Sequence, residues 1–347
     1  MKRLSLTHFR SYTQLELDCS ERVLVILGPN ATGKTNILEA LFVAATGRSF
    51  RAEDETLVQY NQPGYRLDVV HEEETISVTY QARPKRKKFL RNEVAIPRHT
   101  LLGLHPVVLF DPSDSALFSA SPERRRRYID LVLTQTDHLY HRAYVEYRRI
   151  LRQRNSLLWH NRRDSLPDLE DQLFILDTQL SEPAETLYKS RQTFLSHLEP
   201  IVKEKAEHIS QKKLDLRIEY MERTSDLGQR LLENRQRDIV VGTTSAGPHR
   251  EDWHVLHENQ QLSYSASRGE TRTAILALKL AEIEYIQSKT EQTPLLLLDD
   301  VFSELDESRR HWLVDGLTDV QTIITTTDFD RRLDLPAQIL DLTRPLE

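Results

Sequence analysis

Cysteine is almost absent from the 347 residues of this sequence, in which Cys19 is the only one. A lone cysteine excludes an intrachain disulfide, a CxxC metal site and a zinc hook. Long apolar runs are lacking too, since none approaches the roughly 18 residues of a membrane span. The opening stretch MKRLSLTHFRSYTQLELD also lacks the apolar core of a signal peptide. We therefore expect a cytoplasmic protein without a membrane partner.

A strong net charge is also lacking, because the formal charge is only −6. With 29% charged and 39% apolar residues, the chain is typical of a globular protein, and its length allows two domains or one domain with a large insertion. DNA still feels a basic cluster locally, since salt screens charges beyond about 8 Å. Two clusters are candidate DNA contacts, with a solvated hairpin and a solvated helix face as the structural alternatives: Lys85, Arg86, Lys87 and Lys88, and Arg124, Arg125, Arg126 and Arg127.

The order of local patterns predicts an α/β protein with a helical insertion. The segments LSLTHF, LELD, VLVILG and VTYQ favour strands in the N-terminal part. From Pro122 onward, apolar residues at spacings of three and four predict helices, the longest of about 20 residues from Leu139 to Leu158. Pro183 and Pro200 are expected to interrupt or kink the helix that follows. Strands are expected again around residues 214–218, 239–241 and 253–256.

The strongest local pattern is GPNATGKT at residues 28–35, between the apolar segment VLVIL and the helix-like NILEALFVAA. It fits GxxxxGK[ST] in the strand–loop–helix context that this motif requires. Gly28 and Gly33 allow backbone N–H groups to surround phosphate oxygens. Lys34 would reach the β- and γ-phosphates, and Thr35 would bind Mg²⁺. The motif predicts an ATP and Mg²⁺ site with these candidate contacts: Gly28, Pro29, Asn30, Ala31, Thr32, Gly33, Lys34, Thr35 and Asn36.

A second pattern is PLLLLDDVFSELD at residues 294–306, in which four consecutive leucines favour a strand buried on both faces. Asp299 at its end would hold Mg²⁺ through water, and Asp300 would orient or deprotonate the attacking water. A strand followed by an acidic turn is the structural alternative. The phosphate-binding loop (P-loop) pattern at residues 28–35 favours the catalytic interpretation. The expected catalytic residues are Lys34, Asp299 and Asp300, and the expected metal ligands are Thr35 and Asp299.

The stretch SASRGET at residues 265–271 precedes a long helix-like run. Ser and Gly are ordinary loop residues, and Glu suits a first helical turn. Beside the two patterns above, the stretch nevertheless resembles the signature loop of ABC-type ATPases, Ser-x-Gly-Gln or Ser-x-Gly-Glu. The resemblance implies that Ser267, Gly269 and Glu270 complete the nucleotide site of a second subunit, so that ATP drives dimerisation. It also implies that Asp306 crosses the dimer interface and that Thr326 occupies the switch position.

Further segments, in their order and spacing, resemble the RecF family of bacterial DNA replication and repair proteins, which is related to SMC-type ATPases, over nearly the whole chain. These segments are THFRSY (7–12), TGRSFR (46–51), PVVLFDPSD (106–114), SPERRRRYID (121–130), TSAGPHRED (244–252) and DDVFSELD (299–306). The resemblance implies an ABC-type ATPase head, with a mixed sheet and flanking helices, formed by residues 1–121 and 211–347. A short helical arm of residues 122–210 would be inserted into it.

The same resemblance implies an ATP-dependent homodimer that binds DNA at single-/double-strand junctions and gapped duplex. With the partners RecO and RecR it would help to load RecA during DNA repair, replication and the SOS response. Asp300 in place of the usual glutamate fits a weak, DNA-dependent ATPase that acts as a switch. The loop FDPSD lacks the glutamine with which related ATPases sense Mg²⁺ and the γ-phosphate, and neither Asp111 nor Asp114 is assigned that role. Arg10 is either a phosphate contact or a surface residue.

Three other functions are left open by the sequence. An ABC transport ATPase would need far fewer than the 236 residues that separate Gly33 from Gly269. An SMC-like ATPase with another DNA role, of the condensin type, would need a much longer coiled coil, whereas the longest expected helix spans only ~30 Å. A DNA-independent ATPase would be separated from the RecF interpretation by DNA-binding experiments.

Overall fold

The computed structural model of the chain describes residues 1–164, 166–221, 226–304, 306–316, 319–328 and 336–343. Two compact units divide the chain, one formed by Met1–Asp114 with Glu282–Glu347 and the other by Ser115–Ala281. Among the described residues, no helix has both the length and the apolar character to span a bilayer.

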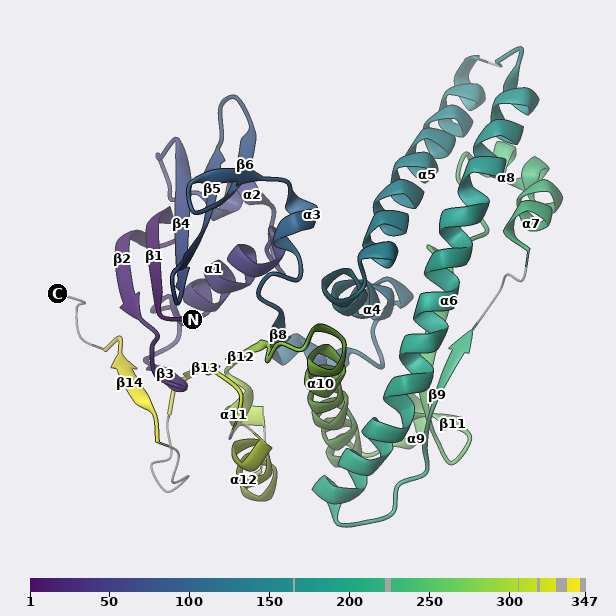
Figure 1. Cartoon of the computed structure of the whole chain (residues 1–347). Helices are drawn as coiled ribbons and strands as arrows, with labels where there is room; N and C mark the ends of the chain where they lie inside the picture. Colours follow the sequence, from purple (N-terminus) through teal and green to yellow (C-terminus); the bar gives the residue numbers. More distant parts are fainter. Residues whose placement is uncertain (165, 222–225, 305, 317–318, 329–335, 344–347) are drawn as a thin grey trace. The chain divides into compact units, whose positions relative to one another are not determined.

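The first unit contains a six-stranded antiparallel sheet in the order β2-β1-β4-β5-β6-β7 (Figure 1). Along β1, Leu4 and Leu6 pair with Val69 and Leu67, and all four side chains are buried. Because successive side chains of a strand point to opposite faces, this alternation indicates a sheet that covers a core with one face. Its strands are β1 (Arg3–Phe9), β2 (Tyr12–Asp18), β4 (Gly64–His71), β5 (Glu74–Gln81), β6 (Arg86–Arg91) and β7 (Val94–Ile96).

The same unit holds a five-stranded parallel sheet in the order β14-β3-β13-β12-β8. Strands β3 and β12 are continuous apolar runs, as is typical of parallel strands buried on both faces, and the leucine run lies in β12. The carboxyl ends of parallel strands meet at one edge, so the ends of β3, β13 and β12 lie side by side. The strands are β3 (Val23–Leu27), β8 (Val107–Phe110), β12 (Leu295–Asp299), β13 (Thr322–Thr326) and β14 (Gln338–Asp341).

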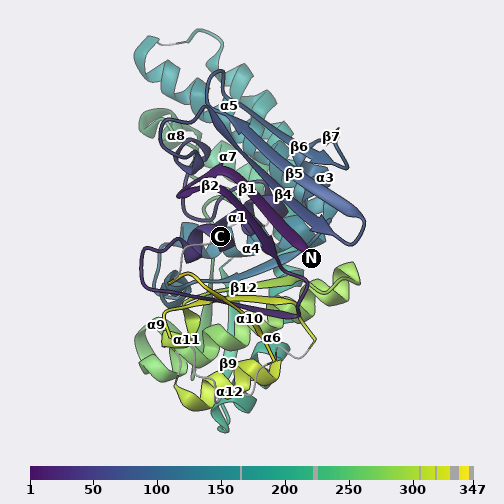
Figure 2. The same ribbon diagram turned by 90° about the vertical axis from the view of Figure 1, so that its left-hand side faces the viewer.

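Helix α1 (Lys34–Thr46) lies between the two sheets, where it contacts strands of both (Figures 1 and 2). It buries Ile37, Leu38 and Leu41, and it ends at Gly47, whose φ of 72° is the left-handed conformation of a helix C-cap. The shorter helices of this unit are α2 (Asp54–Leu57), α3 (Arg98–Leu101), α11 (Val301–Glu304) and α12 (Glu307–Gly316), and a 3₁₀ helix spans Pro112–Ala116.

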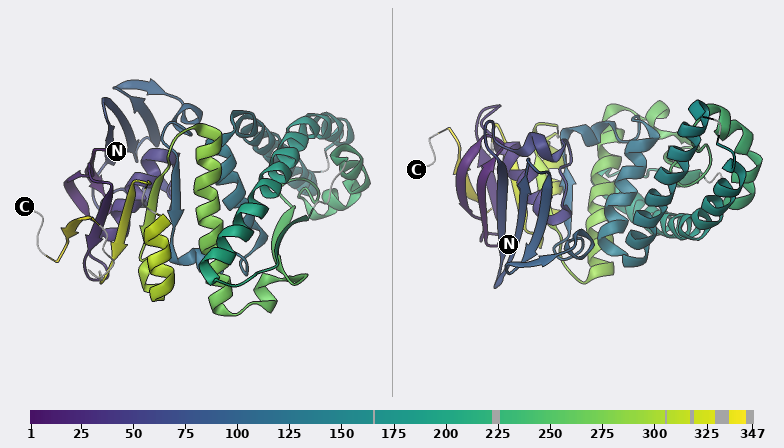
Figure 3. Two further views of the ribbon diagram at one scale, coloured as in Figure 1. Left: turned by 60° about the horizontal axis from the view of Figure 1, so that its bottom comes forward. Right: turned by 90° about the horizontal axis from the view of Figure 1, so that it is seen from above.

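The second unit contains the long helices α5 and α6 and a small antiparallel sheet in the order β11-β10-β9. Helices α5 and α6 pack against each other, and α6 also packs on α7 and β9 (Figures 1 and 3). The elements are α4 (Pro122–Thr136), α5 (His138–Asp164), α6 (Leu169–Ser210), β9 (Leu216–Met221), α7 (Leu227–Glu233), α8 (Arg235–Val241), β10 (Asp252–His257), β11 (Gln260–Gln261) and α9 (Leu262–Ser265). Helix α10 spans Arg268–Thr290 and so runs from this unit into the segment that returns to the first.

The structure differs from the sequence-based expectations in the continuity of α6 at its two prolines, in the lengths of α5 and α6, and at residues 239–241. Helix α6 has 42 residues and continues through Pro183 and Pro200, and α5 has 27 residues, so both exceed the expected 20. Each proline removes one backbone hydrogen bond, and packing of α6 against α5, α7 and β9 outweighs that loss. Residues 239–241, expected as a strand, end helix α8, in which Asp238 is buried and ion-paired. Tertiary contacts here override the strand preference of Ile and Val.

The boundaries of the compact units also differ from the expected boundaries of head and arm. Residues 211–281 belong to the unit of the long helices, although the sequence pattern assigned them to the head. The reason is strand pairing and packing, because β9 pairs with β10 while α6 contacts β9 and α4 contacts β10. A compact unit is defined by contacts between segments that are distant in the sequence. Hydrophobic periodicity indicates local secondary structure and does not indicate such contacts.

Candidate nucleotide-binding site

The loop between β3 and α1 has the backbone geometry of a phosphate-binding loop. Gly33 has φ 98° and Ala31 has φ 68°, both in the left-handed region. A Cβ added to Gly33 would come within 2.7 Å of the Tyr12 hydroxyl oxygen, so a side chain does not fit there. The loop therefore turns directly into α1, and the N–H groups at that helix start are arranged to receive an anion.

Lys34 is held along this loop with its ammonium group directed at the loop's own carbonyls. Its Nζ donates to the Gly28 oxygen at 2.6 Å and to the Pro29 oxygen at 2.8 Å. Burial lowers the pKa of Lys34, while the nearby carboxylates of Asp300 and Asp299 act to raise it. The side chain is thus a cation that the loop already orients, as a phosphate-binding lysine requires.

The hydroxyl of Thr35 and the carboxylate of Asp299 meet across the ends of β3 and β12. Thr35 Oγ1 donates to Asp299 Oδ1 at 2.8 Å, and Thr325 Oγ1 of β13 donates to the same oxygen at 2.7 Å. Asp299 is buried, with 7% of its surface exposed. A hydroxyl beside a carboxylate is the oxygen donor set that suits Mg²⁺, so these two predicted ligands fit the ion.

Asp300 follows Asp299 in a conformation that few residues other than glycine adopt, with φ 51°. Its N–H donates to the Thr325 carbonyl at 3.0 Å and lies 3.1 Å from Thr325 Oγ1. Thr325 therefore fixes both carboxylate residues. The sequence analysis missed Thr325, and the only available signal was its place at the end of an apolar strand beside Thr326.

Arg10, which the sequence left as either a phosphate contact or a surface residue, is anchored on α1. It donates from Nε and Nη2 to the two carboxylate oxygens of Glu39, each at 2.8 Å. Arg51 and Ser49 donate to the same carboxylate at 2.9 and 2.6 Å. Burial acts to raise the pKa of Glu39, but the hydrogen bonds from Arg10, Arg51 and Ser49 outweigh it and lower that pKa. The segments THFRSY and TGRSFR thus meet on one buried carboxylate.

The turn between β1 and β2 is joined to the phosphate-binding loop by Asn36 as well. Its side-chain amide donates to Ser11 Oγ at 2.9 Å, and its oxygen accepts from Arg51 at 2.7 Å. Beside Gly33, burial raises the pKa of the Tyr12 hydroxyl to about 12. Ser11 and Tyr12, the last two residues of the segment THFRSY, therefore belong to the surroundings of the loop.

The two aspartates of the loop after β8 accept hydrogen bonds within that loop. The Asp114 carboxylate is buried and accepts from the Asp111 N–H at 3.1 Å. The Asp111 carboxylate accepts from the Ser113 N–H at 2.7 Å. Both side chains thus bind the backbone of their own loop, and neither is assigned a sensing role.

Thr326 and Asp306 serve local backbone structure in this chain. The Thr326 hydroxyl donates to the Asp328 carbonyl at 2.6 Å, and the Thr326 carbonyl accepts from the Gly28 N–H at 3.2 Å. Asp306 is exposed, and its carboxylate accepts from the Arg309 N–H at 3.0 Å, which caps α12. Their roles in a switch and at a dimer interface stay predictions.

The signature-like loop in the second unit forms the start of α10. Ser267 and Glu270 make a reciprocal capping box there, in which each residue binds a backbone N–H of the other. Ser267 and Arg268 are exposed, and Gly269 is half-buried. The loop is thus a helix N-terminus open to solvent, as the ABC-type interpretation requires.

The first basic cluster is only partly available for DNA. Lys85 forms an ion pair with Glu55. Lys87 forms one with Asp54, and its ammonium lies over the rings of Tyr65 and Phe89. Burial lowers the pKa of Lys87, and its side chain is only 13% exposed. Two members of the cluster, Arg86 and Lys88, are exposed on the other face of β6.

The second basic cluster contains a structural arginine. Arg125 is 5% exposed and donates to both carboxylate oxygens of Asp252, at 2.8 and 2.7 Å. Arg126 donates to the Glu251 carbonyl at 2.7 Å. The prediction of a DNA contact is therefore wrong for Arg125, because its guanidinium is enclosed by SPERRRRYID and TSAGPHRED packing on each other. Arg127 is exposed, and Arg124 is half-buried.

Comparison with known proteins adds the family to this geometry. The chain matches the family model described as "RecF/RecN/SMC N terminal domain" over residues 1–332. It is 34% identical to the DNA replication and repair protein RecF of Ruminiclostridium cellulolyticum, over 94% of this chain and 92% of the relative. It is 35% identical to the protein of that name from Streptococcus gordonii, over 98% and 96%.

Solved structures agree with this comparison. The recombination mediator protein RecF with ATP, described as part of the RecFOR pathway, matches with a TM-score of 0.86 and 30% identity, covering 95% of this chain and 92% of that one. An Smc head domain from Pyrococcus furiosus matches with a TM-score of 0.52 at 16% identity, over 94% and 89%, and so shares the fold alone. The expected ABC-type head fold is thereby confirmed.

Proposed function

The chain belongs to the RecF family, and from this premise we propose that it is an ATP-dependent DNA-binding protein of recombinational repair and replication. Its nucleotide would be ATP with Mg²⁺, and it would act in the cytoplasm. The observation that carries the proposal is the meeting of Thr35 with Asp299 at 2.8 Å beside the oriented Lys34. This arrangement joins a phosphate-binding loop to a metal-binding carboxylate.

Different residues of this site are proposed to bind the nucleotide and to support its hydrolysis. Backbone N–H groups at the start of α1 and the Lys34 ammonium bind phosphate oxygens. Thr35 and Asp299 would hold Mg²⁺, which when bound would supply positive charge to offset that of the phosphates. Asp300, fixed through its backbone by Thr325, orients or deprotonates the attacking water.

Hydrolysis is proposed to be slow and to act as a switch. The aspartate at position 300 is one methylene shorter than the glutamate of many ABC-type ATPases, so it reaches less far towards the water. The loop after β8 keeps Asp111 and Asp114 on its own backbone, so neither carboxylate is proposed to orient the water. A long-lived ATP state suits a protein whose task is to stay on DNA until it is reset.

Dimerisation is proposed to follow ATP binding. Ser267 and Gly269 stand at the exposed start of α10, and a helix N-terminus attracts the γ-phosphate of a nucleotide. Because that phosphate would be presented by a second copy of the chain, each site would need both copies. Asp306 is proposed to cross the same interface, and Thr326 is proposed to occupy the switch position.

The proposed DNA substrates are gapped duplex and single-/double-strand junctions, and the proposed partners are RecO and RecR, with which the protein would help to load RecA. The name RecFOR pathway, printed for a solved relative, supports these partners. Salt-sensitive contacts with phosphates would supply most of the affinity for DNA.

Gel shifts with gapped, duplex and single-stranded DNA, each with and without ATP and Mg²⁺, test this function. We expect ATP-dependent retention that is strongest on gapped DNA. Mass in solution, measured under the same conditions, should double when ATP is present. Absence of ATP-dependent retention on all three DNAs would overturn the proposal and leave a DNA-independent ATPase.

A further inference from the structure

Helix α5 carries a concentration of arginine that neither basic cluster of the sequence analysis included. Its 27 residues hold seven arginines and only two acidic residues. Four of the arginines follow one another at steps of seven, three and eleven residues, which are close to two, one and three helical turns, so they share one face of the helix. This arginine face consists of Arg142, Arg149, Arg152 and Arg163, and all four are exposed.

The arginine face has no carboxylate partner within the described part of the chain. Arg149 donates to the Gln153 amide oxygen at 3.2 Å, and Arg163 lies over the Trp159 ring, 5.0 Å from its centroid. No ion pair joins any of the four to a described acidic side chain. This is unusual in a chain with net charge −6, where acidic residues outnumber basic ones.

Three other cations of the same unit lie beside a carboxylate. Lys189 lies 2.6 Å from Glu185, and Lys203 and Arg217 lie 3.5 and 3.9 Å from Asp215. Each of these three cations has a carboxylate neighbour, whereas the four arginines form no ion pair with a described carboxylate. A helix face with four exposed guanidinium groups is therefore a candidate binding surface for a polyanion.

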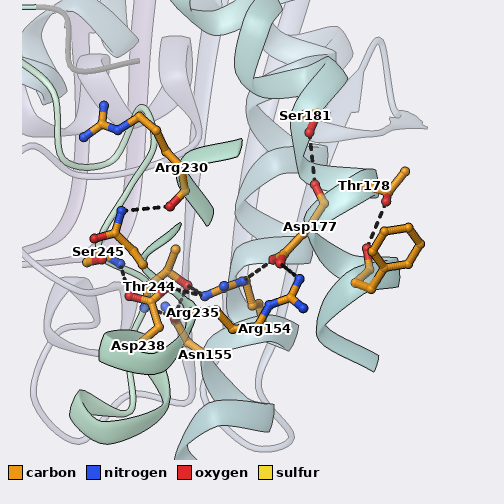
Figure 4. Close-up of polar contacts among 12 residues, drawn as sticks. Arg154, Asn155, Asp177, Thr178, Ser181, Arg230, Arg235, Asp238, Thr244 and Ser245 are labelled. Atoms are coloured by element: carbon orange, nitrogen blue, oxygen red, sulfur yellow. Dashed lines mark hydrogen bonds and ion pairs between the residues drawn. The ribbon is translucent and has the colours of Figure 1, made fainter. Parts of the chain in front are cut away.

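The opposite face of α5 is fixed to its neighbours by a buried ion network (Figure 4). Arg154 is fully buried, and it donates to Asp177 of α6 at 2.6 Å and to Asp238 of α8 at 2.8 Å. Asn155 accepts from the N–H and hydroxyl of Thr244 at 2.8 and 2.7 Å. These contacts fix α5 to its neighbours on the side away from the arginine face, so the arginine face belongs to a rigid element.

We propose that the arginine face of α5 binds the phosphate backbone of a nucleic acid. The inference rests on the proposed DNA-binding function and assigns its surface to the arm helix. From Arg142 to Arg163 the face extends ~31 Å at 1.5 Å per residue, close to the ~34 Å of one turn of duplex DNA. Guanidinium groups bind phosphates with paired hydrogen bonds, and the contacts would carry no sequence information.

Trp159 lies near Arg163, at the C-terminal end of the arginine face, so its fluorescence can report binding to that face. Its side chain is half exposed, at 50%. Of the other two tryptophans, Trp253 is fully buried and Trp312 is half-buried. Indole stacks readily on nucleobases, so DNA on the arginine face should change the fluorescence of Trp159.

The test compares two triple variants by fluorescence anisotropy on labelled gapped duplex, with ATP and Mg²⁺, over a series of salt concentrations. The first variant is R142Q/R149Q/R152Q. The control is K189Q/K203Q/R217Q, which removes the same charge from the same unit at paired positions. Each phosphate contact contributes about 0.9 to the slope of log affinity against log salt. The first variant should lose roughly 2.7 of that slope and at least about tenfold in affinity at physiological salt.

The control variant should keep the wild-type slope, and both variants should keep ATP binding and the circular dichroism spectrum. DNA should change Trp159 fluorescence in the wild type and not in R142Q/R149Q/R152Q. An unchanged slope for the first variant, while the wild type binds DNA, would overturn the inference and leave the proposed function intact. A wild type that binds no DNA would overturn both. Binding of poly-glutamate is measured in the same way. If R142Q/R149Q/R152Q keeps DNA binding but loses poly-glutamate binding, the arginine face is a surface for an acidic protein and the inference is overturned.

Discussion

Ser267 and Glu270 hold each other at the start of α10. The N–H and hydroxyl of Ser267 donate to Glu270 Oε2 at 2.8 and 2.9 Å, and the Glu270 N–H donates to Ser267 Oγ at 3.3 Å. The backbone and side-chain hydrogen bonds from Ser267 lower the pKa of Glu270, so its carboxylate is charged at neutral pH. A negative charge therefore already occupies the helix end at which the proposed dimer would present a phosphate.

Glu270→Gln is expected to tighten the ATP-induced dimer. Glutamine also serves in a capping box, so the helix start is kept while the charge that repels phosphate is removed. About 1 kcal/mol of repulsion at 4 Å in water corresponds to roughly fivefold tighter association for each loop. Sedimentation velocity with ATP and Mg²⁺ measures the dimer constant. A dimer constant equal to or weaker than that of the wild type would contradict this account of Glu270.

Ser267→Arg tests the same loop from the opposite direction. The long cation would fill the exposed helix start, so ATP should still bind to the monomer while the dimer no longer forms. Light scattering with ATP gives the mass, and binding of a fluorescent ATP analogue checks the site. An ATP-induced dimer of this variant would show that the loop has no place in the interface.

Lys34→Ala should abolish useful ATP binding. The variant loses the ammonium group that Gly28 and Pro29 orient, and two charge-assisted hydrogen bonds to phosphate contribute together about 3–6 kcal/mol, which is at least ~100-fold in affinity. Titration with a fluorescent ATP analogue measures the effect. Lys88→Ala, an exposed lysine of β6, is the control and should bind as the wild type does.

Asp300→Asn should separate binding from hydrolysis. Asparagine tolerates the left-handed backbone at this position, where φ is 51°, so the loop should keep its geometry. Loss of the general base lowers hydrolysis by about 10²–10⁴-fold, while ATP binding and the dimer persist. Phosphate release and sedimentation velocity measure the two properties. Wild-type hydrolysis by the variant would remove Asp300 from the mechanism.

Glu39 predicts a dependence of stability on acid pH. Its pKa is lowered in the folded chain from the ordinary 4.5, so its stabilising effect is complete above 4.5 and is lost as pH falls through the lower folded value. Glu39→Gln should therefore cost about 1.5–3 kcal/mol at neutral pH, and the difference from the wild type should shrink below pH 4.5. Urea unfolding from pH 7 to pH 3 measures this. Glu16→Gln, on an exposed site of β2, should show no such difference.

Arg125→Gln should destabilise the second unit without changing the salt slope of DNA binding. The substitution leaves the partly enclosed Asp252 carboxylate without its two-pronged partner, which typically costs about 3–5 kcal/mol for a buried pair. Thermal unfolding and DNA titrations in a salt series measure the two effects. Arg86→Gln, at an exposed position, should change stability by no more than about 0.5 kcal/mol. A normal melting temperature with a reduced salt slope would restore Arg125 as a DNA contact.

Much of the fold and part of the candidate site could be predicted because they depend on short stretches of chain. The P-loop is contiguous, and its glycine spacing, flanking strand and following helix are all local. The run of four leucines likewise indicates a doubly buried strand without reference to any other segment. Glu270 could be recognised as suited to a first helical turn for the same reason, since its partner Ser267 is three residues away.

Contacts between distant segments could not be predicted in this way. Thr325 binds the Asp299 carboxylate across 26 residues, and Arg10 binds Glu39 across 29, yet no pattern links either pair. Pro183 and Pro200 predict an interruption or a kink, and the interruption does not occur because packing keeps α6 continuous. These outcomes are set by the environment of a residue, which local propensity does not describe.

The sequence by itself determined the ABC-type head, the order of its motifs and the membership of the chain in the RecF family, because each depends on spacing along the chain. Only the tertiary structure decided which cationic side chains are exposed and can therefore contact DNA. Arg125 looks like its neighbours in a run of four arginines, but burial against Asp252, 127 residues away, gives it a structural role. The arginine face of α5 became visible for the converse reason, because the fold leaves those four charges exposed with no described acidic partner.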